Sequence, residues 1–224
     1  MLDDVYLGAL LHDIGKFLMR VDNAKIDHST YGHDYVKNRV NSQVAQCIYY
    51  HHANKLRNGN INNDSIAYIV YEADNIAAKS DRRLNEDEEG GYKKDSPLYS
   101  VFNVLNQTIT SEEVAYGVAN IDINQKAVLP KSIQTASLNS KTEDYHKIYS
   151  KYFEQIFNKT DFANPNINSL LQLFESCFCY IPSSTIRKET ADISLFDHVK
   201  LTAAIAACLY IYFQESQITD YKKY

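Results

Sequence analysis

Apolar positions spaced three and four residues apart recur along most of this 224-residue chain, and that spacing predicts a mainly α-helical fold. In the clearest stretch, residues 66–78, Ala67, Val70 and Ala77 share one face with Asp74. The spacing of Val36, Val40 and Val44 likewise gives a second helix a core face. The predicted helices cover residues 5–19, 28 to about 44, 43–50, 66–78, 144–157, 168–180 and 197–215.

Four segments lack helical spacing. Residues 53–60 read as a loop, and residues 85–95 as a charged, glycine-containing loop to which we assign no chemistry. Residues 97–106 are apolar and predict a short helix or strand. Residues 111–140 are short and mixed, with near alternation that predicts one small β-hairpin.

Composition narrows the class of protein. Hydrophobic residues make up 45% of the chain and charged residues 23%, as in an ordinary globular protein. The formal net charge of −5 argues against a broad basic face that grips nucleic acid. It does not exclude a metal-dependent nuclease, because bound cations supply local positive charge. The N-terminus lacks the basic region of a signal peptide, the four cysteines form no C-x-x-C pair, and we expect no membrane span.

The candidate chemistry begins where the first apolar run ends. His12 and Asp13 follow residues 7–11, and Gly15 and Lys16 come directly after them. Alone, such a pair is more often a capping or surface feature than a metal ligand. Other histidines and a carboxylate follow in apolar or turn contexts, and they are groups that Mn, Fe, Co, Ni and Zn accept as ligands. The candidate ligands in the first third of the chain are His12, Asp13, His28, His51, His52 and Asp74.

Adjacent histidines point about 100° apart on a helix. His51 and His52 therefore reach one centre only if their helix ends there, and the loop-like residues 53–60 favour that ending.

Several of these residues also have an ordinary structural explanation. Asp74, a carboxylate on an apolar face, needs a partner, and a salt bridge to Arg82 or Arg83 would serve. The preceding histidines favour metal ligation instead. Lys16 fits a solvated helix end or a contact with a phosphate oxygen. His198 on the last predicted helix, read alone, fits a core histidine, with Leu201 and Ile205 on its face.

The order of these residues resembles the HD phosphohydrolase superfamily. That family's usual first, lone histidine is missing upstream of His12, but its context occurs around His198, in residues 195–206. The resemblance therefore implies a circularly permuted HD-domain helical bundle with a small mixed or β-hairpin insertion. Permutation is tolerated when the ends of a domain lie close together at its surface. The matching segments are His12-Asp13-x-Gly15-Lys16, His28-x-x-x-Gly32, His51-His52 and Asp74.

A permuted HD domain at the start of a chain resembles the large signature subunit of type III-A CRISPR–Cas effector complexes. Members of that family continue into two palm-type domains, whose Gly-Gly-Asp-Asp motif makes cyclic oligoadenylate from ATP. This chain stops at Tyr224 without the motif, so we expect the HD domain alone, excised or truncated. The stretches that also fit are residues 71–77 with 81–83, 97–102, and 181–185 with 192–198.

We expect a single domain over residues 1–224. Residues 1–84 would hold the metal-site helices, residues 85–165 a variable insertion, and residues 166–224 the C-terminal helices that complete the HD core.

The resemblance implies a site for two divalent transition metals, Mn, Ni, Co or Fe. Asp13 would bridge them, and Lys16 would help to stabilise charge on a phosphate. The last helix would bury Leu201 and Ile205 against the first. The implied ligands are His198, His12 and Asp74 on one metal, and His28, His51 and His52 on the other, with His33 in reserve.

The same resemblance implies cleavage of single-stranded DNA by a cytoplasmic complex that contains CRISPR RNA, target RNA and other type III-A subunits, with no membrane. Lys55, Arg57, Arg82 and Arg83 are candidate contacts to the DNA backbone, or solvated surface charges. Two alternatives stay open. The chain would be a hydrolase of small nucleotides or cyclic dinucleotides, or a metal-binding scaffold of the complex with vestigial activity.

Overall fold

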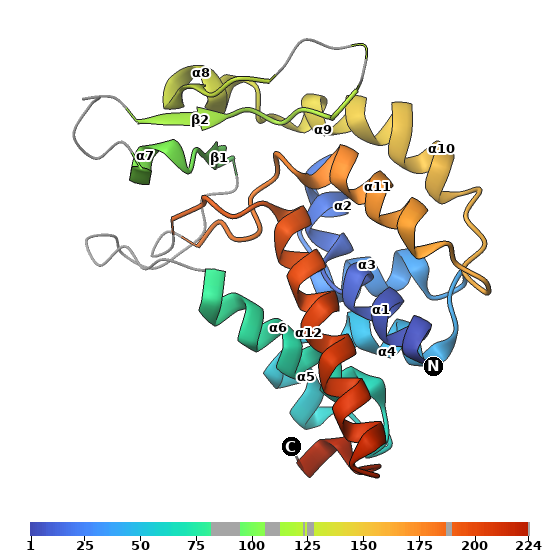
Figure 1. The fold of residues 1–224 in the computed structure, drawn as a ribbon. Helices are drawn as coiled ribbons and strands as arrows, with labels where there is room; N and C mark the ends of the chain where they lie inside the picture. Colours follow the sequence, from blue (N-terminus) through green and yellow to red (C-terminus); the bar gives the residue numbers. More distant parts are fainter. Residues whose placement is uncertain (82–94, 106–112, 123, 125–127, 187–189, 224) are drawn as a thin grey trace.

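The first and last long helices, α1 (Leu2–Leu11) and α12 (Leu195–Glu215), pack against each other at the centre of the computed structural model (Figure 1). This is the contact that a permuted HD bundle requires. Within the described residues the fold is helical apart from one three-stranded sheet, so the predicted class is confirmed. The structure describes residues 1–81, 95–105, 113–122, 124, 128–186 and 190–223.

The single helix predicted for residues 5–19 is wrong, because the chain breaks it into two. Helix α1 ends at Leu11 and α2 covers Ile14–Asp22, with His12 and Asp13 in the turn between them. Asp13 has φ −102° and ψ 10°, outside the helical region. The apolar periodicity runs through the break because the residues on both sides are buried in the same core.

The helix predicted for residues 28 to about 44 ends early, at Val36, as α3 (His28–Val36), and the separate helix predicted for residues 43–50 is confirmed as α4 (Ser42–Tyr50). Asn41 lies in extended backbone and caps α4, since its side chain accepts a hydrogen bond from the N–H of Val44 at 3.0 Å. Val36 and Val44 are fully buried although they belong to different helices. The four-residue spacing thus described a shared core and not one helix.

Helix α4 ends before the two histidines, as expected, but the next segment is not a loop. Residues Ala53–Asn58 form the short helix α5, which buries Leu56. His52 lies in extended backbone between the two helices, with φ −109° and ψ 137°. The expected helix at 66–78 is confirmed as α6 (Ile66–Asp81), which packs against α4 and α12.

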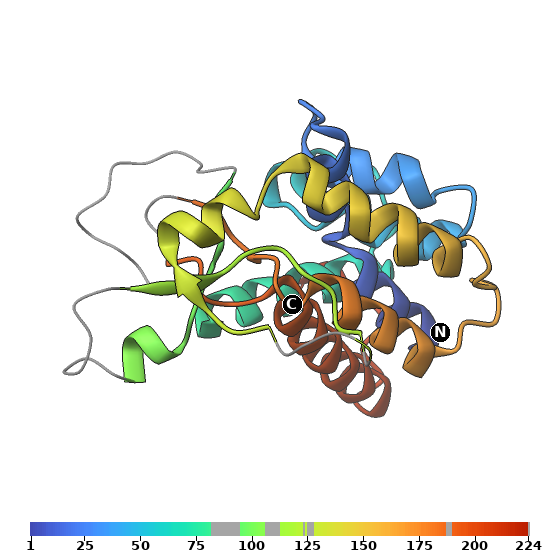
Figure 2. The same ribbon diagram turned by 90° about the horizontal axis from the view of Figure 1, so that it is seen from above.

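A small sheet stands apart from the helical body, as Figure 2 shows from above. Its strands β1 (Leu98–Tyr99), β2 (Val114–Tyr116) and β3 (Lys131–Ser132) are antiparallel in that order. Leu98 pairs with Tyr116, and Val114 pairs with Ser132. The predicted hairpin is therefore part of a three-stranded sheet, accompanied by the helices α7 (Phe102–Leu105) and α8 (Ile133–Leu138).

An aromatic cluster joins the later helices to α2. Residues 142–157 form the predicted helix as α9 (Thr142–Ile148), a π-helical turn (Tyr149–Phe153) and α10 (Glu154–Phe157). The Phe17 ring centroid lies 5.0 Å from that of Phe153 and 5.0 Å from that of Phe178 on α11 (Ile167–Phe178). Because α9 packs on α2, this part of the expected 85–165 insertion belongs to the helical body. A short 3-10 helix, Tyr221–Lys223, follows α12.

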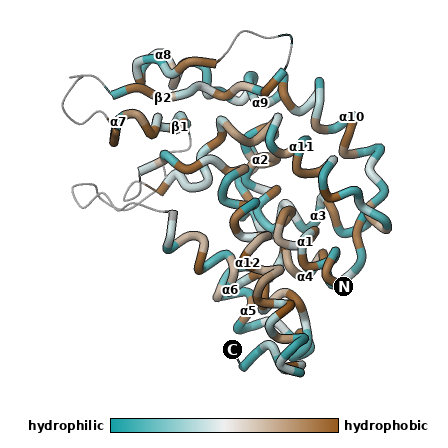
Figure 3. The backbone as a smooth tube through the Cα atoms, in the orientation of Figure 1, coloured by the Kyte–Doolittle hydropathy of each residue, from teal (hydrophilic) through white to brown (hydrophobic). Residues whose placement is uncertain are grey.

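Helix α12 buries a different edge from the one predicted. Leu201 is 37% exposed and Ile205 is only partly buried, whereas Val199, Thr202 and Ala206 are buried beside His198. Thr202 and Ala206 are smaller than Leu201 and Ile205, and smaller side chains at a contact let packed helices lie closer together. Hydrophobic positions recur along α12 in Figure 3, with hydrophilic positions between them.

Contrary to the expectation from sequence, α12 is long and apolar enough to cross a membrane by length and composition. Half of its most apolar stretch is buried inside the protein, against α1 and α6 among others. A core helix passes the same test, and its packing identifies α12 as one.

Candidate metal centre

The break between α1 and α2 aims His12 into the centre of the bundle. Its Nδ1 lies 2.6 Å from the carbonyl oxygen of Ala9, which can only accept a hydrogen bond, so Nδ1 carries the proton. In the neutral imidazole this leaves Nε2 with a lone pair. Such a carbonyl partner is what orients many metal-binding histidines.

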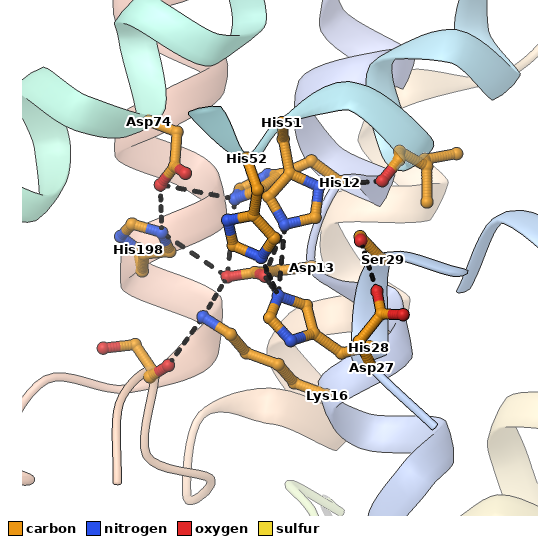
Figure 4. Close-up of polar contacts among 12 residues, drawn as sticks. His12, Asp13, Lys16, Asp27, His28, Ser29, His51, His52, Asp74 and His198 are labelled. Carbon is orange, nitrogen blue, oxygen red and sulfur yellow. Dashed lines mark hydrogen bonds and ion pairs between the residues drawn. The ribbon is translucent and has the colours of Figure 1, made fainter. Parts of the chain in front are cut away.

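His12 belongs to the first of two ligand clusters, together with Asp74 from α6 and His198 from α12 (Figure 4). Nε2 of His198 lies 3.0 Å from Oδ1 of Asp74, and Nε2 of His12 lies 3.6 Å from the same oxygen. Ligand atoms about 2.0–2.2 Å from one ion lie roughly 3–3.5 Å apart. The spacing of this first cluster therefore suits a shared ion.

The second cluster consists of His28, His51 and His52. Nε2 of His28 lies 3.1 Å from Nε2 of His51 and 2.9 Å from Nε2 of His52. His51 repeats the arrangement of His12, since its Nδ1 donates to the carbonyl oxygen of Ile48 at 2.8 Å. The end of α4 makes this possible, because the extended backbone at His52 turns the second ring toward the first.

Asp13 lies between the two clusters and faces both. Its Oδ1 is 3.3 Å from Nε2 of His28 and 3.6 Å from Nε2 of His51. Its Oδ2 is 3.4 Å from Nε2 of His12 and 3.6 Å from Nε2 of His198. One carboxylate thus presents one oxygen to each cluster, which is the geometry of a bridging ligand.

Lys16 holds Asp13 from the other side. Its Nζ donates to Oδ2 of Asp13 at 2.6 Å and to the carbonyl oxygen of Ser183 at 2.9 Å (Figure 4). The N–H of Ser183 donates to the carbonyl of Ile193 at 2.9 Å, just before α12. Residues 181–183 and 193–195 therefore pair side by side, which gives these two sequence-matched stretches a role in placing Lys16.

The field at the centre favours positive charge. Burial raises the pKa of Asp13, but Lys16 and His12 overcome it and hold that pKa well below its usual range. Burial also raises the pKa of Asp74, and its contacts with the rings of His12 and His198 reverse that shift. In His12 burial lowers the pKa, yet the two carboxylates raise it to about 10.

The second cluster behaves differently. Burial, with the neighbouring histidines, holds the pKa of His51 well below its ordinary value and lowers that of His52 to about 4. Both rings are therefore neutral near pH 7, the state in which an imidazole can bind a metal.

A metal ion fits these residues. Nε2 of His12 and Oδ1 of Asp13 are buried, and neither makes a hydrogen bond within the part of the chain that the structure describes. Buried polar atoms are costly without a partner. Every donor is an imidazole nitrogen or a carboxylate oxygen, a set that suits Mn, Fe, Co, Ni or Zn.

The structure does not bring four further candidates to the two clusters or does not describe them. His33 joins neither cluster; its ring packs edge-on against Tyr49 at 5.1 Å, so its place as a reserve ligand is not supported. Arg57 is exposed on α5, and Arg82 and Arg83 lie outside the described residues.

Lys55 is not the free cation that the sequence indicated. Its Nζ donates to Asp27 at 2.6 Å, to Ser29 at 2.6 Å and to Thr30 at 2.5 Å. All three donors of the ammonium group are thereby engaged at the start of α3. Lys55 fastens the helix that carries His28 to the segment that follows His52, and the structure does not support it as a free phosphate contact.

Arg20, which the sequence analysis did not select as a candidate, lies in the same region. Arg20, one turn after Lys16, is 9% exposed and borders a cavity of about 830 Å³ that also touches His28 and His52. The sequence does contain a feature that could have identified it, because Arg20 is the one charged residue between Phe17 and Val21 in an otherwise apolar run.

Comparison with known proteins agrees with this geometry. Residues 1–79 match the family described as HD domain. The chain is 36% identical over 98% of its length to a protein of Enterococcus italicus, and 34% identical over 98% to one of Streptococcus thermophilus. Each is named a CRISPR system single-strand-specific deoxyribonuclease Cas10/Csm1 of subtype III-A. The chain covers 30% and 29% of these two relatives, less than a third of either.

Solved structures give the same relationship. The crystal structure of Csm1 from T. onnurineus matches 92% of this chain with a TM-score of 0.63 at 25% identity. A Csm1–Csm4 cassette in complex with cA4 matches 93% with a TM-score of 0.61 at 25% identity. In both cases the match covers 28% of the solved chain.

Proposed function

We propose that this chain, whose residues 1–79 match the HD-domain family and which is similar along nearly its whole length to Cas10/Csm1 proteins of subtype III-A, is an HD domain that hydrolyses phosphodiester bonds of single-stranded DNA with two divalent metal ions. The names of the relatives support the substrate. The two clusters of ligand atoms support the metals, which we expect to be Mn, Ni, Co or Fe.

The observation that carries this proposal is the position of Asp13. Its two oxygens lie within 3.3–3.6 Å of ligand nitrogens in both clusters. A structural ion pair would need only one partner, and Lys16 already provides it at 2.6 Å. Ligation by both oxygens accounts for the remaining contacts of Asp13.

Metal ions in these clusters would lower the pKa of a bound water and neutralise charge that develops on a phosphate. The residues of the chain provide the rest. His12 and His51 are held by the carbonyls of Ala9 and Ile48, which keeps Nε2 of each pointed at the centre. Lys16 fixes Asp13 between the clusters, and its 17% exposed side chain also borders the cavity where substrate would arrive.

We further propose the setting that the relatives imply. The domain would act in a cytoplasmic antiviral complex with other type III-A subunits, CRISPR RNA and target RNA, as the Csm1–Csm4 structures suggest for one such subunit. Residues 1–84 would supply the metal-site helices, 85–165 the insertion, whose helix α9 packs on α2 in the helical body, and 166–224 the completing helices. The 224 residues contain no Gly-Gly-Asp-Asp sequence, so we assign them no cyclic oligoadenylate synthesis.

The test is a turnover screen of the purified chain with each of Mn²⁺, Ni²⁺, Co²⁺ and Fe²⁺. Substrates are a labelled single-stranded oligonucleotide, its duplex, deoxynucleoside triphosphates and cyclic dinucleotides. We expect metal-dependent cleavage of the single strand alone. Turnover of nucleotides without cleavage of DNA would show that the chain is a small-nucleotide hydrolase instead. Metal binding without turnover of any substrate would support the metal-binding scaffold.

A further inference from the structure

The cavity beside the second cluster has walls that the metal site does not explain. His28 and His52 form one side of it. The other sides come from the end of α2 with Met19 and Arg20, from the start of α5 with Ala53, and from residues 183–186. Its volume of about 830 Å³ lies within the roughly 300–1,000 Å³ of pockets that hold small-molecule ligands.

Arg20 brings an uncompensated positive charge to this cavity. It is 9% exposed, and its Nη1 donates to the carbonyl oxygen of Lys16 at 2.9 Å. Its Nε is buried and has no hydrogen-bond partner, and no carboxylate among the described residues pairs with its guanidinium. A buried charge without a counterion is costly, and an arginine in this state is suited to a phosphate.

Much of the remaining wall is apolar. Met19, Ala24, Ala53 and Ile186 all border the cavity. Sites for single-stranded nucleic acid combine positive charge for the backbone with surfaces that receive bases. Bases in a duplex are stacked and paired, and only an unstacked base can enter a pocket of this kind.

We propose that this cavity binds one unstacked nucleotide of the substrate strand, next to the phosphate that is cut, with Arg20 as the residue that contacts its phosphate. The proposal rests on the proposed function, since the clusters define where the cut phosphate lies. It also supplies a physical reason for preferring single strands, because a duplex cannot place a base there without unpairing it.

The experiment measures binding apart from cleavage. Fluorescence anisotropy in EDTA, where no turnover occurs, follows a labelled 20-residue oligothymidylate on the wild-type chain, Arg20→Ala and Arg20→Lys across salt concentrations. Each phosphate contact to a single strand contributes about 0.7 to the slope of log affinity against log salt. We expect Arg20→Ala to bind at least fivefold more weakly with a slope lower by about 0.7, and Arg20→Lys to keep most of the slope.

The matched control is Lys223→Ala, which removes one exposed positive charge from the short helix Tyr221–Lys223 at the C-terminal end of the chain; the C-terminus lies away from α2 in Figure 1. It should leave both affinity and slope unchanged. Because Arg20 is buried, thermal unfolding must show that its variants are folded. Ala24→Trp tests the cavity independently: it fills the space without touching a ligand and should raise KM for cleavage while leaving kcat nearly unchanged.

The outcomes separate this inference from the proposed function. Equal affinity and slope for folded Arg20→Ala, or no oligonucleotide binding by the wild-type chain in EDTA, would overturn the nucleotide cavity whether or not the chain cleaves DNA. If DNA binding depends on Arg20 but the chain cleaves DNA with none of the metals, the nucleotide-binding cavity is supported and the proposed nuclease activity is overturned.

Discussion

Nε2 of His198 lies 3.0 Å from Oδ1 of Asp74, although the two residues come from α12 and α6 and are far apart in the sequence. His12 approaches the same oxygen at 3.6 Å, and the rings of His12 and His198 are 5.4 Å apart between centroids. Three separate segments therefore meet at one carboxylate. Read alone, the sequence favoured His198 as a core histidine; its position gives it the same surroundings as His12.

The replacement His198→Ala should weaken metal binding by at least the 10- to 100-fold seen for residues that support a metal site. The replacement removes one candidate ligand nitrogen from the first cluster. Calorimetric titration with Mn²⁺ measures the change in metal affinity. His146→Ala is the control, since His146 is exposed on α9. Unchanged affinity in the His198 variant would remove α12 from the site.

The replacement Asp13→Ala should abolish cleavage and reduce the bound metal below two ions per chain. Asp13 presents one oxygen to each cluster, so its loss affects both ions. Metal content by mass spectrometry and cleavage of single-stranded DNA provide the measurements. Retained Mn²⁺-dependent cleavage by the pure variant would contradict the bridging assignment.

The replacement Gly15→Ala should damage the second cluster without touching a ligand. A Cβ at Gly15 would lie 1.9 Å from the carbonyl oxygen of His28, so α3 must move away from α2. Overpacking of this kind costs about 1–3 kcal/mol of stability, or more. Thermal unfolding should show that loss, and metal titration should show one weakened site. Wild-type stability would mean that α2 and α3 are not in close contact.

Metal binding should strengthen as pH rises. In the metal-free protein the pKa of His12 is raised to about 10 and that of His52 is lowered to about 4. Near pH 7.5 a metal ion must therefore displace a proton from His12 but none from His52. We expect release of about one proton and up to a tenfold gain in affinity per pH unit.

Calorimetry in two buffers of different ionisation enthalpy counts the released protons. Zero release would show that His12 is already neutral.

The stability of the metal-free chain should change with pH in the opposite direction to metal affinity. Because the folded-state pKa of His12 lies above the ordinary 6.5, its contribution to the stability of the metal-free chain is complete below about pH 6.5 and is lost as pH rises toward about 10.

The replacement Lys55→Met should lower the free energy of unfolding by about 1–3 kcal/mol, since it removes hydrogen bonds from a charged group to Asp27, Ser29 and Thr30. Chemical denaturation measures the change. Lys37→Met, which breaks only an exposed pair with Asp34, should cost about 0–1 kcal/mol. A loss of DNA affinity in Lys55→Met without loss of stability would instead restore Lys55 as a phosphate contact.

The sequence by itself was sufficient for the helical class and for the candidate ligands in the first third of the chain, because both depend on local signals. Periodic apolar residues report burial, and His or Asp residues next to buried runs are conspicuous. The same signals could not place helix ends. Residues 5–19 and 28–44 kept helical spacing across real breaks, since the residues on either side face one core.

Tertiary structure decided which candidate ligands meet and which basic side chains keep an atom without a partner. Lys55 and Arg20 are both basic residues close to ligand histidines in the sequence, yet contacts with α3 occupy Lys55, while the Nε of buried Arg20 has no partner in the described chain. Those partners come from distant segments, and no local pattern encodes them. Likewise, one carboxylate can face two clusters only because the turn at residues 12–13 and the packing of α12 on α1 bring both clusters to Asp13.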